Sequence, residues 1–271
     1  MKAFLKGRPY LTISAMTNVI TSTTAAQSIS LTHKYRRIIM DKINSDVIVK
    51  IKYLLRDHLH EDGSVLYGGL ETIKKGDIYL LGINPGGSNK SRTLEEDLIE
   101  TPEKSYSAYC DEDWTNNNSG NGNSKFQKRI NWLIARLGYN MRDVCSTNLI
   151  FFRSQNVKNL TRVMADVCWP VHEVLLKIVK PKIILTIGNS YSTNSPYAYI
   201  QSIYGGDTYE PIKANHGNYS IKIMRTKILE NDVFVVGFPH LSWYSPENKV
   251  DIPGLRKIIG LSAEVAKCKE T

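Results

Sequence analysis

The sequence predicts an α/β fold, a three-layer α/β/α sandwich in which helices cover both faces of a mostly parallel central sheet. Short apolar runs alternate along the chain with segments of helical periodicity. The runs show little polar alternation, which is typical of strands buried on both faces. Each run ends in a loop rich in Gly, Asn or Ser, as expected where parallel strands leave a sheet. With 271 residues, 42% of them hydrophobic, the chain is long enough for one such domain and a modest extension.

The patterned part of the chain begins near residue 45. Residues 1–44 mix Ser, Thr and Ala with isolated apolar residues, so we expect a poorly ordered or extra N-terminal segment there and a single domain over 45–271. The segment VIVKIKYLL from Val47 fits a first helix. The apolar run at 78–83, IYLLGI, ends abruptly in NPGGSN and predicts the first buried strand.

The alternation continues to the end of the chain. Residues 112–125 are rich in Asn and Gly and predict an exposed loop before a helix. That helix has apolar side chains at helical spacing: Phe126, Ile130, Leu133, Ile134 and Leu137. The later predicted elements are a strand at 145–152, a helix from Pro170 to the residue before Pro181, a strand at 183–189, a short helix at 196–204, neighbouring strands at 219–229 and 233–238, and a last helix at 253–266.

Four loops at the ends of these strands carry small and polar residues: NPGGS, RSQN, GNS and PHLS. The carboxyl ends of parallel strands meet at one edge of a sheet, so these loops are expected to converge on a single crevice that binds a ligand.

Charge and cysteine content narrow the classes of protein. Lys and Arg exceed Asp and Glu by nine, which favours a polyanionic partner such as nucleic acid. The four cysteines are far apart, with no CxxC pair, which argues against a disulfide framework and a zinc ribbon. His58 and His60 are read as a solvated stretch, so no metal site is expected. Lacking an apolar run of about 18 residues, the protein is expected to be cytoplasmic, without a membrane partner, and monomeric.

Three motifs, in order, resemble the uracil-DNA glycosylase superfamily. GINPGGS at 82–88 is similar to the first motif of the mismatch-specific uracil/thymine-DNA glycosylases. HLSWYS at 240–245 resembles the second motif, H-P-S-x-x-S. STNLIFFRS at 146–154, followed by the helix and strand at 168–188, resembles the iron–sulfur members from their uracil-recognising Asn onward. The resemblance covers about residues 76–260. It implies the glycosylase fold and a monofunctional enzyme that flips uracil or a related damaged pyrimidine out of DNA and hydrolyses its N-glycosidic bond.

The resemblance gives Asn84 and His240 the catalytic roles. Breaking this bond produces an oxocarbenium-like sugar and a departing base that gains negative charge. Asn84 would orient a water beneath C1′ through its carbonyl oxygen, although more slowly than an Asp could, because an amide takes up no proton at neutral pH. His240, in its neutral form, would donate a hydrogen bond to the uracil O2.

The resemblance assigns further residues to bind the base and to contact the DNA. Asn148 offers a donor and an acceptor for the O4 and N3–H edge of uracil, a pattern that cytosine cannot satisfy. Phe126 takes the place of the stacking aromatic, with Tyr106, Tyr109 and Trp114 as alternatives. Gly82 and Ile83 complete the base pocket. The predicted DNA contacts are Pro85, Gly86, Gly87, Ser88, Ser242, Trp243, Tyr244 and Ser245. Among these, Tyr244 is the preferred wedge to fill the gap left by a flipped base.

The sequence departs from the family at several places. Leu241 replaces the proline of the second motif, and a slip of two residues would put Phe238 in place of His240. Phe152 and Cys168 stand where the iron–sulfur members carry two of their cysteines, so no cluster or other cofactor is expected. Singly, each motif also has a structural explanation: NPGG is a common turn, and Asn148 could cap backbone groups. The alternative function is a catalytically weak or inactive relative that binds nucleic acid or a nucleotide-like ligand.

Overall fold

The computed structural model describes residues 45–87, 92–102, 105–115, 119–190, 195–214, 217–247 and 249–260. The chain divides into two compact units, Met1–Ser45 and Asp46–Thr271, and the fold described below belongs to the second. The expectation for residues 1–44, the role of Ser88 and the end of the last predicted helix lie outside the described residues.

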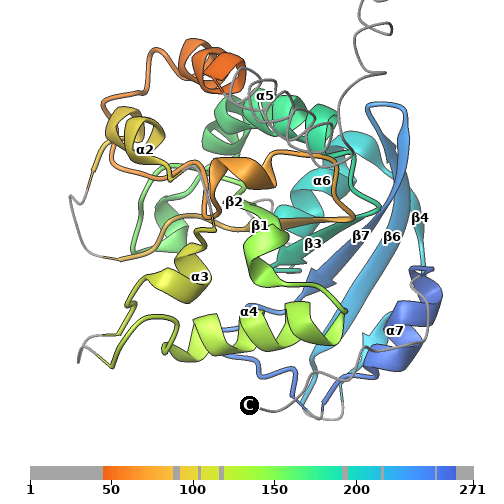
Figure 1. Ribbon diagram of the computed structural model, residues 1–271. Coiled ribbons are helices and arrows are strands. Elements are labelled where there is room, and N and C mark those ends of the chain that lie inside the picture. Colours follow the sequence, from red (N-terminus) through yellow and green to blue (C-terminus); the bar gives the residue numbers. More distant parts are fainter. Residues whose placement is uncertain are drawn as a thin grey trace, which may run out of the picture. The chain divides into compact units, whose positions relative to one another are not determined.

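A seven-stranded sheet organises the domain, in the order β2-β1-β3-β7-β6-β4, with β5 paired to β6 (Figure 1). The strands are β1 Ile78–Gly82, β2 Cys145–Asn148, β3 Ile183–Ile187, β4 Asp207–Thr208, β5 Ile212–Lys213, β6 Ser220–Ile228 and β7 Asn231–Phe238. Strands β2, β1, β3 and β7 run parallel. Strand β6 is antiparallel to β7, and β4 and β5 are antiparallel to β6. The prediction of an α/β fold with a mostly parallel sheet is therefore confirmed.

Helices cover both faces of the sheet. The helices are 45–54, α2 Leu94–Glu100, α3 Ala108–Asp111, α4 Lys125–Arg136, α5 Arg162–Val179, α6 Pro196–Tyr204 and α7 Ile252–Ile258, with 3-10 turns at Leu70–Thr72, Met141–Asp143 and Val157–Asn159. On one face, Tyr79 and Leu81 of β1 share a core with helix 45–54, α5 and α6. On the other, Leu80 packs with α4 and α7. Figure 1 shows α5 and α4 on opposite sides of the strands. All five residues of β1 are buried, which explains the uninterrupted apolar run in the sequence.

Local sequence signals set several element boundaries. Ser124 caps α4 in a reciprocal pair with Gln127, and Thr161 accepts a hydrogen bond from the Met164 N–H at the start of α5. The turn between β6 and β7 holds Leu229 and Glu230 at φ of 47° and 65°. Two consecutive left-handed residues match the twist of an antiparallel hairpin. The predicted pair of neighbouring strands is thus a hairpin.

Two predicted elements have wrong boundaries. Strand β2 ends at Asn148, four residues before the predicted end. The chain leaves the strand after this residue, although residues 149–151 stay buried and Phe152 is partly buried. Helix α5 begins at Arg162, eight residues before its predicted start at Pro170, and therefore contains this proline. The short elements α2, α3, β4 and β5 were not predicted. No helix in the described part of the chain is long and apolar enough to cross a bilayer.

Candidate functional site

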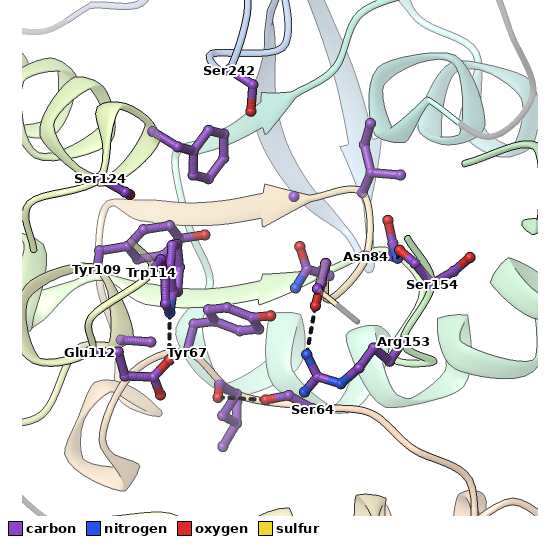
Figure 2. Close-up of a pocket in the computed structure, with 18 of the residues that line it drawn as sticks. Ser64, Tyr67, Asn84, Tyr109, Glu112, Trp114, Ser124, Arg153, Ser154 and Ser242 are labelled. Atoms are coloured by element: carbon purple, nitrogen blue, oxygen red, sulfur yellow. Dashed lines mark hydrogen bonds between the residues drawn. The ribbon is translucent and has the colours of Figure 1, made fainter. Parts of the chain in front are cut away.

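A pocket of about 1000 Å³ lies at the carboxyl edge of the parallel strands. Its walls come from the ends of β1 and β2, the loops that follow β1, β2 and β7, and the segments around α2, α3 and the start of α4 (Figure 2). Predicted site residues that line it are Gly82, Ile83, Asn84, Gly86, Gly87, Phe126, Asn148, His240 and Ser242. The three motifs, far apart in sequence, therefore supply walls of one cavity.

Asn84 follows β1, and hydrogen bonds to backbone carbonyl groups hold the nitrogen of its side-chain amide. Its Nδ2 donates hydrogen bonds to the carbonyl oxygens of Pro85, at 2.7 Å, and Ser154, at 2.9 Å. An amide nitrogen has two hydrogens, so both are used. These partners also settle which end of the side chain is nitrogen. The carbonyl oxygen Oδ1 is the atom left to accept a hydrogen bond from a water or ligand.

Asn148 ends β2 directly beside Gly82, its partner in the β1–β2 register. A Cβ atom at position 82 would lie 2.1 Å from Asn148 Oδ1, so only glycine leaves room for this side chain. The Asn148 Nδ2 atom is buried and has no hydrogen-bond partner among the described residues. Buried amide groups are rarely left unpaired, and an exception indicates a group that a ligand or water satisfies.

His240 follows β7 and lines the pocket. Its Nδ1 accepts a hydrogen bond from the Ser242 N–H at 3.3 Å, so the neutral imidazole carries its proton on Nε2. Burial lowers the pKa of His240 from its usual 6.5 and favours that neutral form. Phe238, the alternative in the slipped register, is fully buried at the end of β7 and does not line the pocket.

An aromatic wall runs along one side of the pocket. Phe126 contacts His240, Trp114 and Tyr109, with Trp114 and Tyr109 each 6.3 Å away between ring centroids. Tyr67 packs against both Tyr109 and Trp114. The predicted stacking residue and its alternatives Tyr109, Trp114 and Tyr106 all line the cavity. The loop at 112–125 was predicted to be exposed, but its residue Trp114 forms part of the pocket wall.

Several polar and charged residues of this pocket were not predicted as site residues. Arg92 lines it. Glu112, Arg153 and Tyr67 also line it, with Ser64 and Ser154 (Figure 2). Arg153 lies in the RSQN segment, whose position after β2 was the only usable signal. Glu112, Arg92 and Tyr67 come from irregular loops before or between helices, where no periodicity indicates which way a side chain points.

The predicted DNA-contacting residues do not all fit that role. Trp243 is 83% exposed, whereas Tyr244 is only 1% exposed and its ring packs 5.1 Å from that of Tyr219. The choice of Tyr244 as the wedge is therefore wrong, because a core side chain cannot enter a duplex. Pro85 is buried, and neither it nor Ser245 lines the pocket.

Leu241 and Arg129 hold the loop that follows β7 and carries His240. Leu241 is fully buried and packs in the core on the α4 side of the sheet. Leu241 therefore anchors this loop in the core. Arg129 Nη1 donates to the carbonyl oxygens of Leu241 and Ser242, the latter at 3.0 Å. These contacts fix the backbone that orients the imidazole.

Cys168 lies in the core, where its thiol is shielded from solvent. It is fully buried, its Sγ accepts a hydrogen bond from the Phe151 N–H at 3.4 Å, and burial raises the pKa of its thiol to about 12. Within the described residues, no group of three or more His, Cys, Asp or Glu side chains is placed to hold a metal ion.

Comparison of the sequence with models of known protein families and with curated proteins finds no match in either.

Proposed function

We propose that this chain is a DNA glycosylase with a uracil-DNA glycosylase-like fold, which hydrolyses the N-glycosidic bond of uracil or a related damaged pyrimidine. One observation carries the proposal. The amide nitrogen of Asn84 and the Nδ1 atom of His240 are both engaged by backbone groups, so an acceptor oxygen and an Nε2–H donor remain for a ligand in the same pocket. The proposed reaction needs this pair of groups.

The two side chains act on opposite ends of the bond that breaks. Asn84 Oδ1 accepts a hydrogen bond from a water and holds it beneath C1′ of the flipped nucleotide. His240 Nε2–H donates to the base O2, where charge builds up as the C1′–N1 bond breaks and its electron pair moves to the base. The water oxygen then bonds to C1′ and releases a proton to solvent. The products are an abasic site and a free base.

Asn148 supplies selectivity for the base. Its buried, unpartnered Nδ2 donates to O4, and its carbonyl oxygen accepts the N3–H of uracil. Cytosine presents an amino group and a bare ring nitrogen at these positions, so both contacts would become repulsive. Discrimination by buried polar groups of this kind is strong because a mismatch leaves them unpaired.

The net positive charge of the chain and the exposed side chain of Trp243 both favour binding to duplex DNA. The surplus of nine positive charges favours the phosphate backbone. Trp243, three residues after His240, is exposed, and in this proposal it fills the gap that a flipped base leaves.

The test is a glycosylase assay on labelled oligonucleotides that contain uracil or 5-hydroxymethyluracil, single-stranded or opposite G or A, followed by alkaline cleavage of abasic sites. Asn84→Ala and His240→Ala should abolish cleavage. His60→Ala, at a histidine whose side chain is 76% exposed, is the matched control and should retain it. Absence of cleavage of every substrate, together with salt-sensitive DNA binding, would favour the non-catalytic alternative.

A further inference from the structure

The pocket is larger than a pyrimidine base requires. Its volume of about 1000 Å³ lies at the upper end of the range of roughly 300–1,000 Å³ found for sites that enclose whole drug-sized molecules. Asn84, Asn148 and His240 mark only one part of it. Another part is a polar compartment, which we define by Arg92, Tyr106, Glu112 and Arg153, all of which line the same cavity.

The acidic side of the polar compartment is held in place by its neighbours. Both carboxylate oxygens of Glu112 accept hydrogen bonds, one from the Tyr106 hydroxyl and one from Trp114 Nε1 at 2.6 Å. Each carboxylate oxygen retains a second lone pair for a ligand. Arg92 lies close enough to Glu112 and Tyr106 to interact electrostatically with both, and it forms ion pairs with Asp97 and Glu100.

The basic side has an unused donor. Arg153 Nη1 donates to the Gly86 carbonyl at 2.6 Å, but its Nε atom is buried and has no hydrogen-bond partner in the described part of the chain. A guanidinium N–H shielded from water is normally paired. The compartment thus combines a carboxylate acceptor with a cationic donor.

Tyr67 connects the polar compartment to the base site. Its hydroxyl lies beside the Asn148 amide and interacts electrostatically with Arg153 and Glu112, while burial raises its pKa. A group attached to the base next to the atom that Asn148 contacts would pass Tyr67 and enter the compartment. For a pyrimidine whose O4 faces Asn148, that attachment point is C5.

We propose that the base removed is a pyrimidine with a bulky, uncharged, hydroxyl-bearing substituent at C5, and that this substituent occupies the polar compartment. This inference rests on the proposed function. Hydroxyl groups both donate and accept, so they can satisfy Glu112 and Arg153 together. An apolar substituent of equal size would leave both charged groups desolvated and unpaired. An anionic substituent would face the carboxylate of Glu112.

The experiment compares single-turnover rates of base release from duplexes that contain uracil, 5-hydroxymethyluracil, its glucosylated form, or 5-hexynyluracil. The glucosylated base should be released at least tenfold faster than the apolar hexynyl base and faster than uracil. Glu112→Gln and Tyr106→Phe should remove most of this preference, with uracil release serving as the check on folding. Glu95→Gln is the matched control, since Glu95 lies on α2 and outside the pocket.

The failures of the two proposals can be told apart. Release of uracil at a rate equal to or above that of every substituted base would overturn the inference and leave the proposed function standing. Equal rates for the glucosylated and hexynyl bases would also overturn it, because the rate of base release would then depend on the size of the C5 substituent and not on its hydroxyl groups. Release of no base from any duplex would overturn both proposals.

Discussion

The imidazole of His240 stacks on the phenyl ring of Phe126, with ring centroids 5.2 Å apart and an angle of 20° between the planes. The stack shields one face of the imidazole from water and fixes the plane in which Nε2–H points. Phe126 therefore does more than offer a surface for the base. It also keeps the histidine in the neutral form that the proposed chemistry needs.

The first prediction concerns the pH dependence of base release. Because burial lowers the pKa of His240 below 6.5, the rate should stay flat as the pH falls through 6.5 and decline only at lower pH. Phe126→Ala exposes the imidazole, so its pKa should rise and the decline should begin at higher pH. Single-turnover rates across the pH range check this. A decline at the same pH in both proteins would show that the stack does not control the titration.

The second prediction is that Asn84→Asp lowers activity. A carboxylate is a better base than an amide, so the change looks favourable from the reaction alone. In this structure, however, it removes two hydrogen bonds and places negative charge beside the carbonyl oxygens of Pro85 and Ser154. We expect base release to fall at least about tenfold and stability to fall by about 1 kcal/mol for each lost hydrogen bond. A faster variant of unchanged stability would contradict the assigned orientation of the amide.

The pocket residues that could be predicted from the sequence lie in a different kind of segment from those that could not. Asn84 and His240 lie in loops that follow buried parallel strands, and the ends of such strands meet at one edge, so their convergence on one pocket could be predicted. Asn148 is the last residue of β2 and was singled out by the family resemblance alone. Glu112 and Tyr67 were missed because they lie in irregular loops, where orientation depends on contacts distant in sequence. The same limit produced the wrong choice of Tyr244, since neighbouring loop residues carry no signal of which one is buried.

The third prediction concerns the close approach of Gly82 and Asn148. Gly82→Ala should displace the Asn148 side chain, because a Cβ atom would lie 2.1 Å from its Oδ1. We expect overpacking to cost roughly 2 kcal/mol and base release to be lost. Gly76→Ala is the control, since its Cβ would meet nothing closer than 3.7 Å. Denaturant unfolding and the cleavage assay measure both effects, and a stable, active Gly82→Ala protein would exclude the role assigned to Asn148.

The fourth prediction separates two adjacent aromatic residues. Trp243→Ala should weaken binding to a duplex that contains an abasic site by about tenfold without changing the melting temperature, because the side chain is exposed and available as a wedge. Tyr244→Ala should destabilise the fold by about 3–5 kcal/mol, the usual cost of deleting a buried aromatic ring. Binding titrations and thermal melts distinguish the two. Unchanged binding by Trp243→Ala would remove the wedge from the proposal.

The last prediction is a loss of stability in acid that depends on His172. This residue of α5 is fully buried: its Nδ1 lies 2.9 Å from the Tyr79 hydroxyl, and its Nε2 lies 3.1 Å from the Leu149 carbonyl, next to Asn148. Burial lowers its pKa from 6.5 to about 4. Between these values the unfolded chain binds the proton and the folded chain does not, so stability is complete above pH 6.5 and falls as the pH approaches 4. At about 1.4 kcal/mol for each pH unit, the loss amounts to about 3 kcal/mol.

His172→Gln can keep a donor and an acceptor but cannot take up this proton. The variant should be less stable than the wild type at pH 8, and the gap should shrink by pH 4.5 in urea unfolding. Parallel stability curves would mean that other groups cause the acid sensitivity.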